Sequence, residues 1–339
     1  MKRFRLISII LLLLVAIYFM FFFKTNSKKA PANEYIALHG ATFGTFYHVT
    51  YAIAGNTNLQ VAIDSTLRQV DSALSMFNQQ SIIARINAGD TAVCTNALFD
   101  SVFLCAQRIS TASGGAFDIT VAPLVNFWGF GFEQPDSVCM SQLDSLMPLI
   151  GYHKVRLENH HIIKDNPHIM LDASAIAKGF GCDCVANTLE HYGVTNYMIE
   201  IGGEVRTAGH NAQGNIWRIG INKPVDDTTG TTSQIERVVP LANGGMATSG
   251  NYRNFYTRNG QRFAHTIDPH TGCPVQHSLL SATVTAADCM TADAVATACM
   301  VLGVEPGMAL CKQLGLECFF IYAEGDSTRT IWSKGFQTE

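Results

Sequence analysis

Charged residues are scarce in this chain, because Asp, Glu, Lys and Arg make up only 15% of its 339 residues. The formal net charge is −4, which gives no electrostatic support for nucleic-acid binding. Hydrophobic residues make up 47%, enough for a sizeable core, and the length allows one large domain or two modest ones. The composition therefore argues against a nucleic-acid-binding protein and indicates a globular one.

Internal repeats are also absent, and no low-complexity segment follows residue 34. No change of composition marks a boundary between two soluble domains. We therefore expect a single folded domain over residues 35–339.

The ten cysteines lack the spacing of a metal site. Cys182 and Cys184 are too close together for a zinc-type pair, and no second pair follows in phase. Most of the others, such as Cys299, stand in apolar surroundings. We interpret the cysteines as small buried hydrophobic residues and assign none of them to a metal.

The N-terminus contains an unbroken hydrophobic run from Leu6 to Phe23, preceded by three basic residues. These eighteen residues are just enough to cross a bilayer, and no small-x-small cleavage motif follows them. The run predicts an uncleaved signal-anchor over residues 1–23, in preference to a cleaved signal peptide, and then a polar tether over residues 24–34. Its basic end should stay in the cytoplasm, which places the folded domain on the other side of the membrane. No cysteine lies near enough to carry a lipid.

The spacing of hydrophobic residues after the tether predicts a mixed α+β domain. Helices are expected at 61–77, from 99 to the glycines at 114–115, and at 174–192, 291–302 and 305–314. Strand-like alternation runs over 37–54, and further strands are expected at 153–157, 161–164, 197–206, 216–221, 236–241, 262–268, 280–287 and 318–323. Residues 246–253 are expected to form a turn of small residues.

Asp293 and Thr297 are the polar side chains of an Ala-rich helical stretch over residues 292–302. Their spacing of four stacks both oxygens on one face of the helix. A buried carboxylate needs a partner, and a hard cation such as Mg²⁺ would supply one. The alternative is that Asp293 stabilises the N-terminus of its own helix while Thr297 bonds back to a carbonyl.

Asp172 and Ser174 precede another Ala-rich run and are typical of a helix N-cap. The N-terminus of such a helix can bind phosphate, and Lys178 adds a positive charge. Alternatively, Asp172 is simply the cap and Lys178 is solvated, although a lysine in the first turn opposes the helix dipole.

Two further segments allow both a functional and a structural interpretation. The aromatic loop at 123–131 follows paired glycines and could stack on a planar ligand, or it could belong to the core. His265 lies in a predicted strand that ends in an Asp-Pro turn, where it could act as a general base or be structural.

These segments, taken in order, closely resemble the ApbE family, the FAD:protein FMN transferases. The matching blocks are GATFGTFY (40–47), SMFNQQSIIARIN (75–87), GGAFDITVAPLVNFWGFG (114–131), LDASAIAKGFGCD (171–183), YMIEIGGEVRTAGHN (197–211), WRIGINKP (217–224), ATSGNYRNFY (247–256), HTIDPHTG (265–272) and TADAVATACMVLG (291–303).

The resemblance implies a T-fold-like α+β domain in which helices flank mixed or antiparallel sheets. It implies Mg²⁺-dependent transfer of FMN from FAD to a Ser or Thr hydroxyl of an acceptor protein, with release of AMP. The acceptor would be a flavoprotein subunit of a membrane redox complex, with a motif of the type D-x-x-S-G-A-[ST]. Two alternatives stay open: an FAD pyrophosphatase that forms FMN and AMP, and a non-catalytic, membrane-tethered FAD-binding protein. The location implied is the bacterial inner membrane, with the catalytic domain in the periplasm.

The resemblance also implies roles for individual residues. The metal ligands would be the Ala175 backbone oxygen, the Asp293 carboxylate and the Thr297 hydroxyl, and His265 would be the general base. FAD contacts would come from Phe43, Phe77, Ala116, Phe117, Asp118, Asp172, Lys178 and Ile267. Three positions depart from the family pattern: Phe43 stands where Met is usual, and His270 and Cys273 stand where Arg and Tyr are common.

Overall fold

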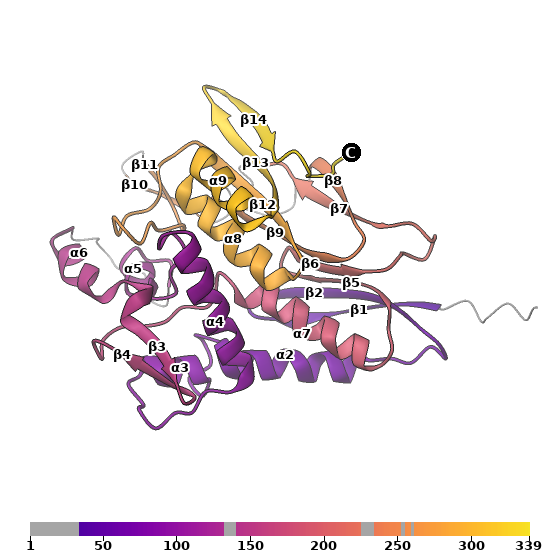
Figure 1. Ribbon diagram of the computed structural model, residues 1–339, viewed down its shortest axis with the longest axis horizontal. Helices are drawn as coiled ribbons and strands as arrows, with labels where there is room; N and C mark the ends of the chain where they lie inside the picture. The colour runs from indigo at the N-terminus through magenta and orange to yellow at the C-terminus, as the bar shows by residue number, and fades with distance from the viewer. Residues whose placement is uncertain (1–33, 132–139, 225–233, 252–254, 259–260) are drawn as a thin grey trace, which may run out of the picture.

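A central antiparallel sheet of eight strands organises the fold, in the order β1-β2-β5-β6-β9-β12-β13-β14 (Figure 1). The computed structural model describes residues 34–131, 140–224, 234–251, 255–258 and 261–339. The strands of this sheet are β1 (Glu34–Thr42), β2 (Thr45–Ile53), β5 (Asn196–Ile201), β6 (Glu204–Ala208), β9 (Gly244–Gly250), β12 (Leu279–Ala286), β13 (Glu317–Glu324) and β14 (Ser327–Trp332). Three two-stranded ribbons pair β3 (Val155–Glu158) with β4 (His161–Lys164), β7 (Trp217–Asn222) with β8 (Ile235–Leu241), and β10 (Phe255–Arg258) with β11 (Gln261–Ala264).

The described residues also form eight α-helices. They are α2 (Gln60–Leu74), α3 (Ile82–Asn87), α4 (Ala97–Ala112), α5 (Ala122–Phe127), α6 (Met140–Leu146), α7 (Ala177–His191), α8 (Cys289–Leu302) and α9 (Val304–Leu314), with short 3-10 turns at Met147–Leu149 and Tyr152–Lys154. Helix α7 packs on β5 and β6, while α8 packs on β9 and β12. Helices α2 and α4 lie against α7 and α8 respectively (Figure 1). The α+β class with antiparallel sheets is thus confirmed.

The β7–β8 ribbon contributes to a separate hydrophobic cluster with residues of the main sheet. Trp217 and Val239 of the ribbon pack there with Val205 and Phe319 of the sheet. The C-terminal residue Glu339 extends the ribbon through two backbone hydrogen bonds with Val238. Strands β6 and β13 therefore pack some of their side chains against the β7–β8 ribbon. The largest hydrophobic cluster instead joins residues of the sheet to residues of the helices.

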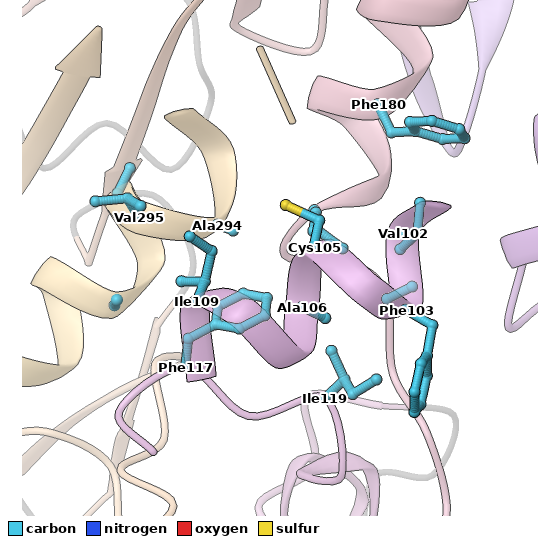
Figure 2. Close-up of a cluster of buried hydrophobic side chains, with 14 of the residues drawn as sticks. Val102, Phe103, Cys105, Ala106, Ile109, Phe117, Ile119, Phe180, Ala294 and Val295 are labelled. Atoms are coloured by element: carbon cyan, nitrogen blue, oxygen red, sulfur yellow. The ribbon is translucent and has the colours of Figure 1, made fainter. Parts of the chain in front are cut away.

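The largest cluster contains one side of helix α4 (Figure 2). Val102, Phe103, Ala106 and Ile109 follow the spacing of an amphipathic helix and are almost fully buried. They pack in the same cluster as residues of α8 and of the segment 117–119 that follows the helix (Figure 2). This packing fixes the end of α4, from which the chain enters the cavity described below.

Helices α7 and α8 approach each other closely and satisfy each other's N-terminal backbone groups. In α7, Asp183 accepts the N–H groups of Cys289 and Met290 at 3.0 and 2.8 Å. In α8, Asp293 accepts the N–H of Gly179 at 2.9 Å. These are helix N–H groups that have no partner within their own helix. Each helix therefore caps the other with a carboxylate, which is buried in Asp293 and partly buried in Asp183.

Three expectations about local structure were wrong. Helix α7 begins at Ala177 with Ile176 as its N-cap residue, so Asp172 and Ser174 do not cap it. Instead the Asp172 carboxylate accepts the N–H of Ser174 at 2.7 Å, in a local turn. Residues 244–250 form the central strand β9 instead of a turn. The strand expected to continue to residue 268 ends at Ala264.

Glycines divide two of the expected strands. Residues 37–54 form the hairpin of β1 and β2, whose two turn residues Phe43 and Gly44 have φ of 50° and 72°, as in a type I′ turn. Residues 197–206 form β5 and β6, joined at Gly202 and Gly203 with φ of 60° and 106°. Strand β14, at the edge of the sheet, was not expected.

The proposed anchor over residues 1–23, and its tether up to residue 33, lie outside the described residues. Within the described ranges, no helix combines the length and the apolar character needed to cross a membrane.

Candidate functional site

A cavity of about 670 Å³ opens between the helices and the loops beside the sheet. It brings together eleven of the twelve residues expected at the site, from segments that are far apart in the chain. They are Phe77, Ala116, Phe117, Asp118, Asp172, Ala175, Lys178, His265, Ile267, Asp293 and Thr297. We call the side formed by Ala175, Lys178, Asp293 and Thr297 the helix wall, and the side formed by residues 116–118 and 265–269 the loop wall.

Phe43 is the exception. It lies in the β1–β2 turn, packs with residues of two hydrophobic clusters and lines a second cavity of about 560 Å³ beside α2. A Cβ atom on Gly181 of α7 would stand 2.6 Å from the Phe43 ring. Phe43 thus packs against α7 and does not line the main cavity.

The helix wall brings a buried carboxylate to the N-terminus of α7. The Gly179 N–H is one of the first N–H groups of α7, which have no partner within the helix, and it donates to Asp293 Oδ2. Ala175 precedes the helix and lines the same cavity. Asp293 is only 2% exposed. It lies in the second turn of α8, whose N-cap is Asp288, so it does not stabilise the start of its own helix.

Thr297 follows one turn later on α8 and also lines the cavity. Its hydroxyl shares a hydrogen bond of 3.1 Å with the hydroxyl of Ser249 in β9. The hydroxyl thus pairs with Ser249 and not, as in the alternative interpretation, with a carbonyl of its own helix. A carboxylate, a hydroxyl and a carbonyl oxygen are ligands suited to a hard cation.

Lys178 pairs with Glu204, a residue for which we expected no role. Lys178 Nζ lies 2.9 Å from Glu204 Oε1, and Glu204 is 3% exposed. Its other oxygen, Oε2, has no hydrogen-bond partner among the described residues. The signal that could have indicated this residue is its position directly after the paired glycines of the β5–β6 turn.

Lys178 stands between two acidic groups of the helix wall. Burial opposes the charge on Lys178, but Asp293 and Glu204 outweigh it and hold the pKa of the ammonium above its usual value. Burial raises the pKa of Glu204, against the attraction of Lys178. An added cation at this wall would favour the charged form of Glu204.

The loop wall is held by Asp118. Its Oδ1 accepts the N–H and the hydroxyl of Thr120, both at 2.7 Å, and its Oδ2 accepts the N–H of Tyr152 at 2.7 Å. Burial raises the pKa of this carboxyl, although the three hydrogen bonds act in the opposite direction. Asp118 therefore fixes the backbone of the loop wall while it lines the cavity.

The aromatic residues around the cavity differ in exposure. Phe117 is 2% exposed and belongs to the core, whereas Phe77 is 79% exposed. Phe130 lines the cavity and meets His265 edge to face, with ring centroids 6.3 Å apart. Trp128 is buried and donates its indole N–H to the carbonyl of Gly272 at 2.7 Å. The segment 123–131, which was expected to be a loop, begins with helix α5 and supplies both core and cavity residues.

Cysteine and histidine supply no metal centre in the part of the chain that is described. No group of three or more His, Cys, Asp or Glu side chains could hold a metal there. Seven of the nine described cysteines are buried, Cys273 is partly buried and Cys94 is exposed. A cation at the helix wall would instead rely on one carboxylate together with carbonyl and hydroxyl oxygens.

Residues 43–320 match the ApbE family. The chain belongs to this family. It is 38% identical over 314 residues to the FAD:protein FMN transferase of Vibrio cholerae, covering 90% of this chain and 92% of that protein. It is also 38% identical over 316 residues to the FAD:protein FMN transferase of Haemophilus influenzae, covering 89% and 90% respectively.

Solved structures of ApbE proteins share the fold. The flavin transferase ApbE of Vibrio cholerae matches with a TM-score of 0.81 at 36% identity, over 90% of this chain and 98% of that one. The flavinyl transferase ApbE of Pseudomonas stutzeri, in its apo form, matches with a TM-score of 0.79 at 32% identity, over 89% and 95%. The family resemblance expected from the sequence is confirmed.

Proposed function

We propose that this chain is an FAD:protein FMN transferase that uses Mg²⁺ at the helix wall. Its curated relatives carry the transferase name along nearly their whole length. The observation that carries the metal proposal is that the buried Asp293 carboxylate, the Thr297 hydroxyl and Ala175 line one side of the same cavity.

The residues of the helix wall fit a magnesium ion. Asp293, Thr297 and the Ala175 carbonyl would supply oxygen ligands, and Mg²⁺ usually completes its shell with water and substrate phosphate. The bound ion would neutralise charge on the pyrophosphate of FAD. Asp293 and Glu204 both favour positive charge at this wall, as their effect on the pKa of Lys178 shows, and this supports a cation here.

The chain's own side chains then have distinct tasks. Lys178, held by Glu204, would bind a phosphate oxygen of FAD from the helix wall. His265, on the loop wall, would accept the proton of the acceptor Ser or Thr hydroxyl. That oxygen forms a bond to the phosphorus of the FMN half as the bond to AMP breaks, and AMP leaves. Positioning and charge neutralisation carry most of such a reaction.

The acceptor and the location are part of the same proposal. The acceptor would be a flavoprotein subunit of a membrane redox complex with a D-x-x-S-G-A-[ST] motif. Residues 1–23 would anchor the chain in the bacterial inner membrane, with the catalytic domain in the periplasm. The uninterrupted apolar run after three basic residues supports this arrangement.

The test is to incubate the protein with FAD, Mg²⁺ and a peptide that carries the acceptor motif. We expect covalent flavin on the peptide, with one AMP released for each flavin attached. A matched peptide with Ala in place of the acceptor Ser or Thr should stay unlabelled. Equal amounts of free FMN and AMP with either peptide would instead identify an FAD pyrophosphatase. Bound FAD that releases no AMP would identify a non-catalytic FAD-binding protein.

A further inference from the structure

His270 connects the two segments of the loop wall, although it does not line the cavity. Its Nε2 lies 2.9 Å from the carbonyl oxygen of Gly114, at the end of α4. Its Nδ1 lies 3.0 Å from Oδ1 of Asp268, in the turn that follows Ile267. The imidazole therefore spans from the turn at 268–272 to the turn that leads into residues 116–118.

Both contacts require a hydrogen on the ring nitrogen. A carbonyl oxygen and a carboxylate oxygen can only accept hydrogen bonds, and a neutral imidazole has a single N–H. Only the imidazolium, with two N–H groups, makes both bonds together. The neutral ring keeps one of them and places a lone pair against the other oxygen.

Gly115 allows the ring to lie this close to the backbone. Its φ is 94°, and a Cβ atom there would stand 3.3 Å from His270 Nε2 and 3.6 Å from the Tyr152 ring. The same turn is held from its other side by Asp118, which accepts the N–H of Tyr152. His270 and Asp118 thus fix the two sides of one turn in the loop wall.

The charges around His270 favour the imidazolium. The hydrogen bond to Gly114 raises the pKa of His270 most, burial opposes the rise, and the carboxylates of Asp268 and Asp118 add to it. Tyr152, His153 and Lys154 are the other titratable side chains of the adjoining turn. Because the pKa is raised on folding, the charged form and both bonds are present at low pH and are lost as the pH rises through it.

We propose that protonated His270 is a positioning residue that holds the loop wall in its FAD-binding shape, so that FAD binding weakens when the ring loses its proton. The inference rests on the proposed function. Arg is common at this position in the family pattern, and its charge does not titrate in this range. This chain therefore has a titratable cation where a permanent one is usual.

The experiment compares FAD affinity from pH 5.5 to pH 9 for the wild type, His270→Arg and His270→Gln, in constant salt and Mg²⁺. For the wild type we expect the Kd to rise about three- to tenfold with pH, the size of one net hydrogen bond. His270→Arg should lack this rise and remain tight, and His270→Gln should be weak at every pH. In turnover assays at any one pH, the KM for FAD should differ among the three proteins as the Kd does, while kcat at saturating FAD should be the same in all three.

His277 provides a matched control. Its Nε2 lies 2.8 Å from the Met300 carbonyl, and its Nδ1 accepts the N–H of Leu279 at 3.3 Å. A neutral imidazole has one N–H for the Met300 carbonyl and one lone pair for the Leu279 N–H. His277 therefore needs no second proton, and His277→Gln should keep the wild-type pH dependence of the Kd for FAD. Circular dichroism of each variant checks that it is folded. His265 also lines the cavity, and the difference between wild type and His270→Arg removes its contribution.

The outcomes separate the inference from the proposed function. If the wild type and His270→Arg bind FAD with the same pH dependence, the positioning role of His270 is wrong and the proposed function stands. If the wild type binds no FAD at any pH, both are wrong. If His270→Gln binds as tightly as the wild type at low pH, the two hydrogen bonds have no effect on the cavity, and the inference is overturned.

Discussion

The two walls of the cavity are held together in different ways. In the helix wall, Asp183 and Asp293 each bond to backbone N–H groups of the neighbouring helix, and no exposed side chain takes part. In the loop wall, the backbone is held by Asp118 from inside and by His270 from outside. His270 remains 56% exposed, so its contacts compete with water.

This difference assigns different tasks to the two walls. A buried site with fixed backbone groups suits a metal ion, because the ligands must keep their geometry. A wall of loops held partly by an exposed side chain can open and close more readily, which suits the entry of a large substrate and of an acceptor protein. Variants of each wall should therefore fail in different ways.

The largest effect is expected from His265 on the loop wall. His265→Gln removes the proposed proton acceptor, and general-base catalysis is typically worth about 10²–10⁴-fold in rate. We expect kcat for transfer to fall by that factor while the Kd for FAD changes little, as measured by rapid-quench assays and by fluorescence titration. An unchanged kcat would show that another group accepts the proton.

On the helix wall, two substitutions of Asp293 separate charge from hydrogen bonding. Both Asp293→Asn and Asp293→Ala should lower Mg²⁺-dependent transfer by at least about 100-fold, since even supporting residues of metal sites are worth 10–100-fold. Only Asp293→Ala removes the acceptor of the Gly179 N–H, so it alone should lose about 1–3 kcal/mol of stability.

Metal titration and thermal unfolding measure the two effects of Asp293. If Asp293→Asn responds to Mg²⁺ like the wild type, the carboxylate serves the helices and not a cation.

A smaller effect is expected from Lys178. Lys178→Met keeps the length of the side chain and removes its charge, which should raise the KM for FAD about 10- to 100-fold, the range for a hydrogen bond to a charged group. Lys178→Arg keeps the charge and should be affected less. Glu204→Gln tests the pairing, because it should weaken FAD binding without removing the ammonium. Steady-state kinetics at saturating Mg²⁺ measure all three.

Local patterns predicted the elements well where the chain alternates regularly, and less well where distant segments decide the structure. The spacing of Asp293 and Thr297 on one helix face could be predicted. The bond from Asp293 to Gly179 could not, because the two residues are 114 positions apart. The role of Asp172 could not be predicted for the same reason. Its sequence context resembles an N-cap, but the Gly179 N–H, which a cap residue would accept, is accepted by Asp293.

Strand β9 was mistaken for a turn for a related reason. Its residues are small because α8 lies against it: a Cβ atom on Gly245 would stand 2.4 Å from the backbone of Cys289. Small residues in a strand lack the alternation on which prediction depends. Phe43 shows the converse, since the family pattern implied a flavin contact and the ring packs against α7.

The smallest effect concerns how tightly the helix wall is packed, and two glycines of α7 test it together. Either glycine replaced by alanine gains about 1 kcal/mol of helix propensity. A Cβ atom on Gly179 would lie 2.4 Å from the carbonyl oxygen of Cys289, whereas one on Gly181 would lie 2.6 Å from the Phe43 ring.

The backbone of Cys289 cannot move away from Gly179 without separating α7 from α8. The partly buried ring of Phe43 lies at a turn and can rotate away from Gly181. Gly179→Ala should therefore destabilise the fold by about 1–3 kcal/mol, as overpacking does, and weaken Mg²⁺ binding, while Gly181→Ala should be close to neutral. Urea unfolding and Mg²⁺ titration of both variants measure this. Equal stability of the two would mean that α7 and α8 can shift apart without loss, and that the helix wall is no more rigid than the loop wall.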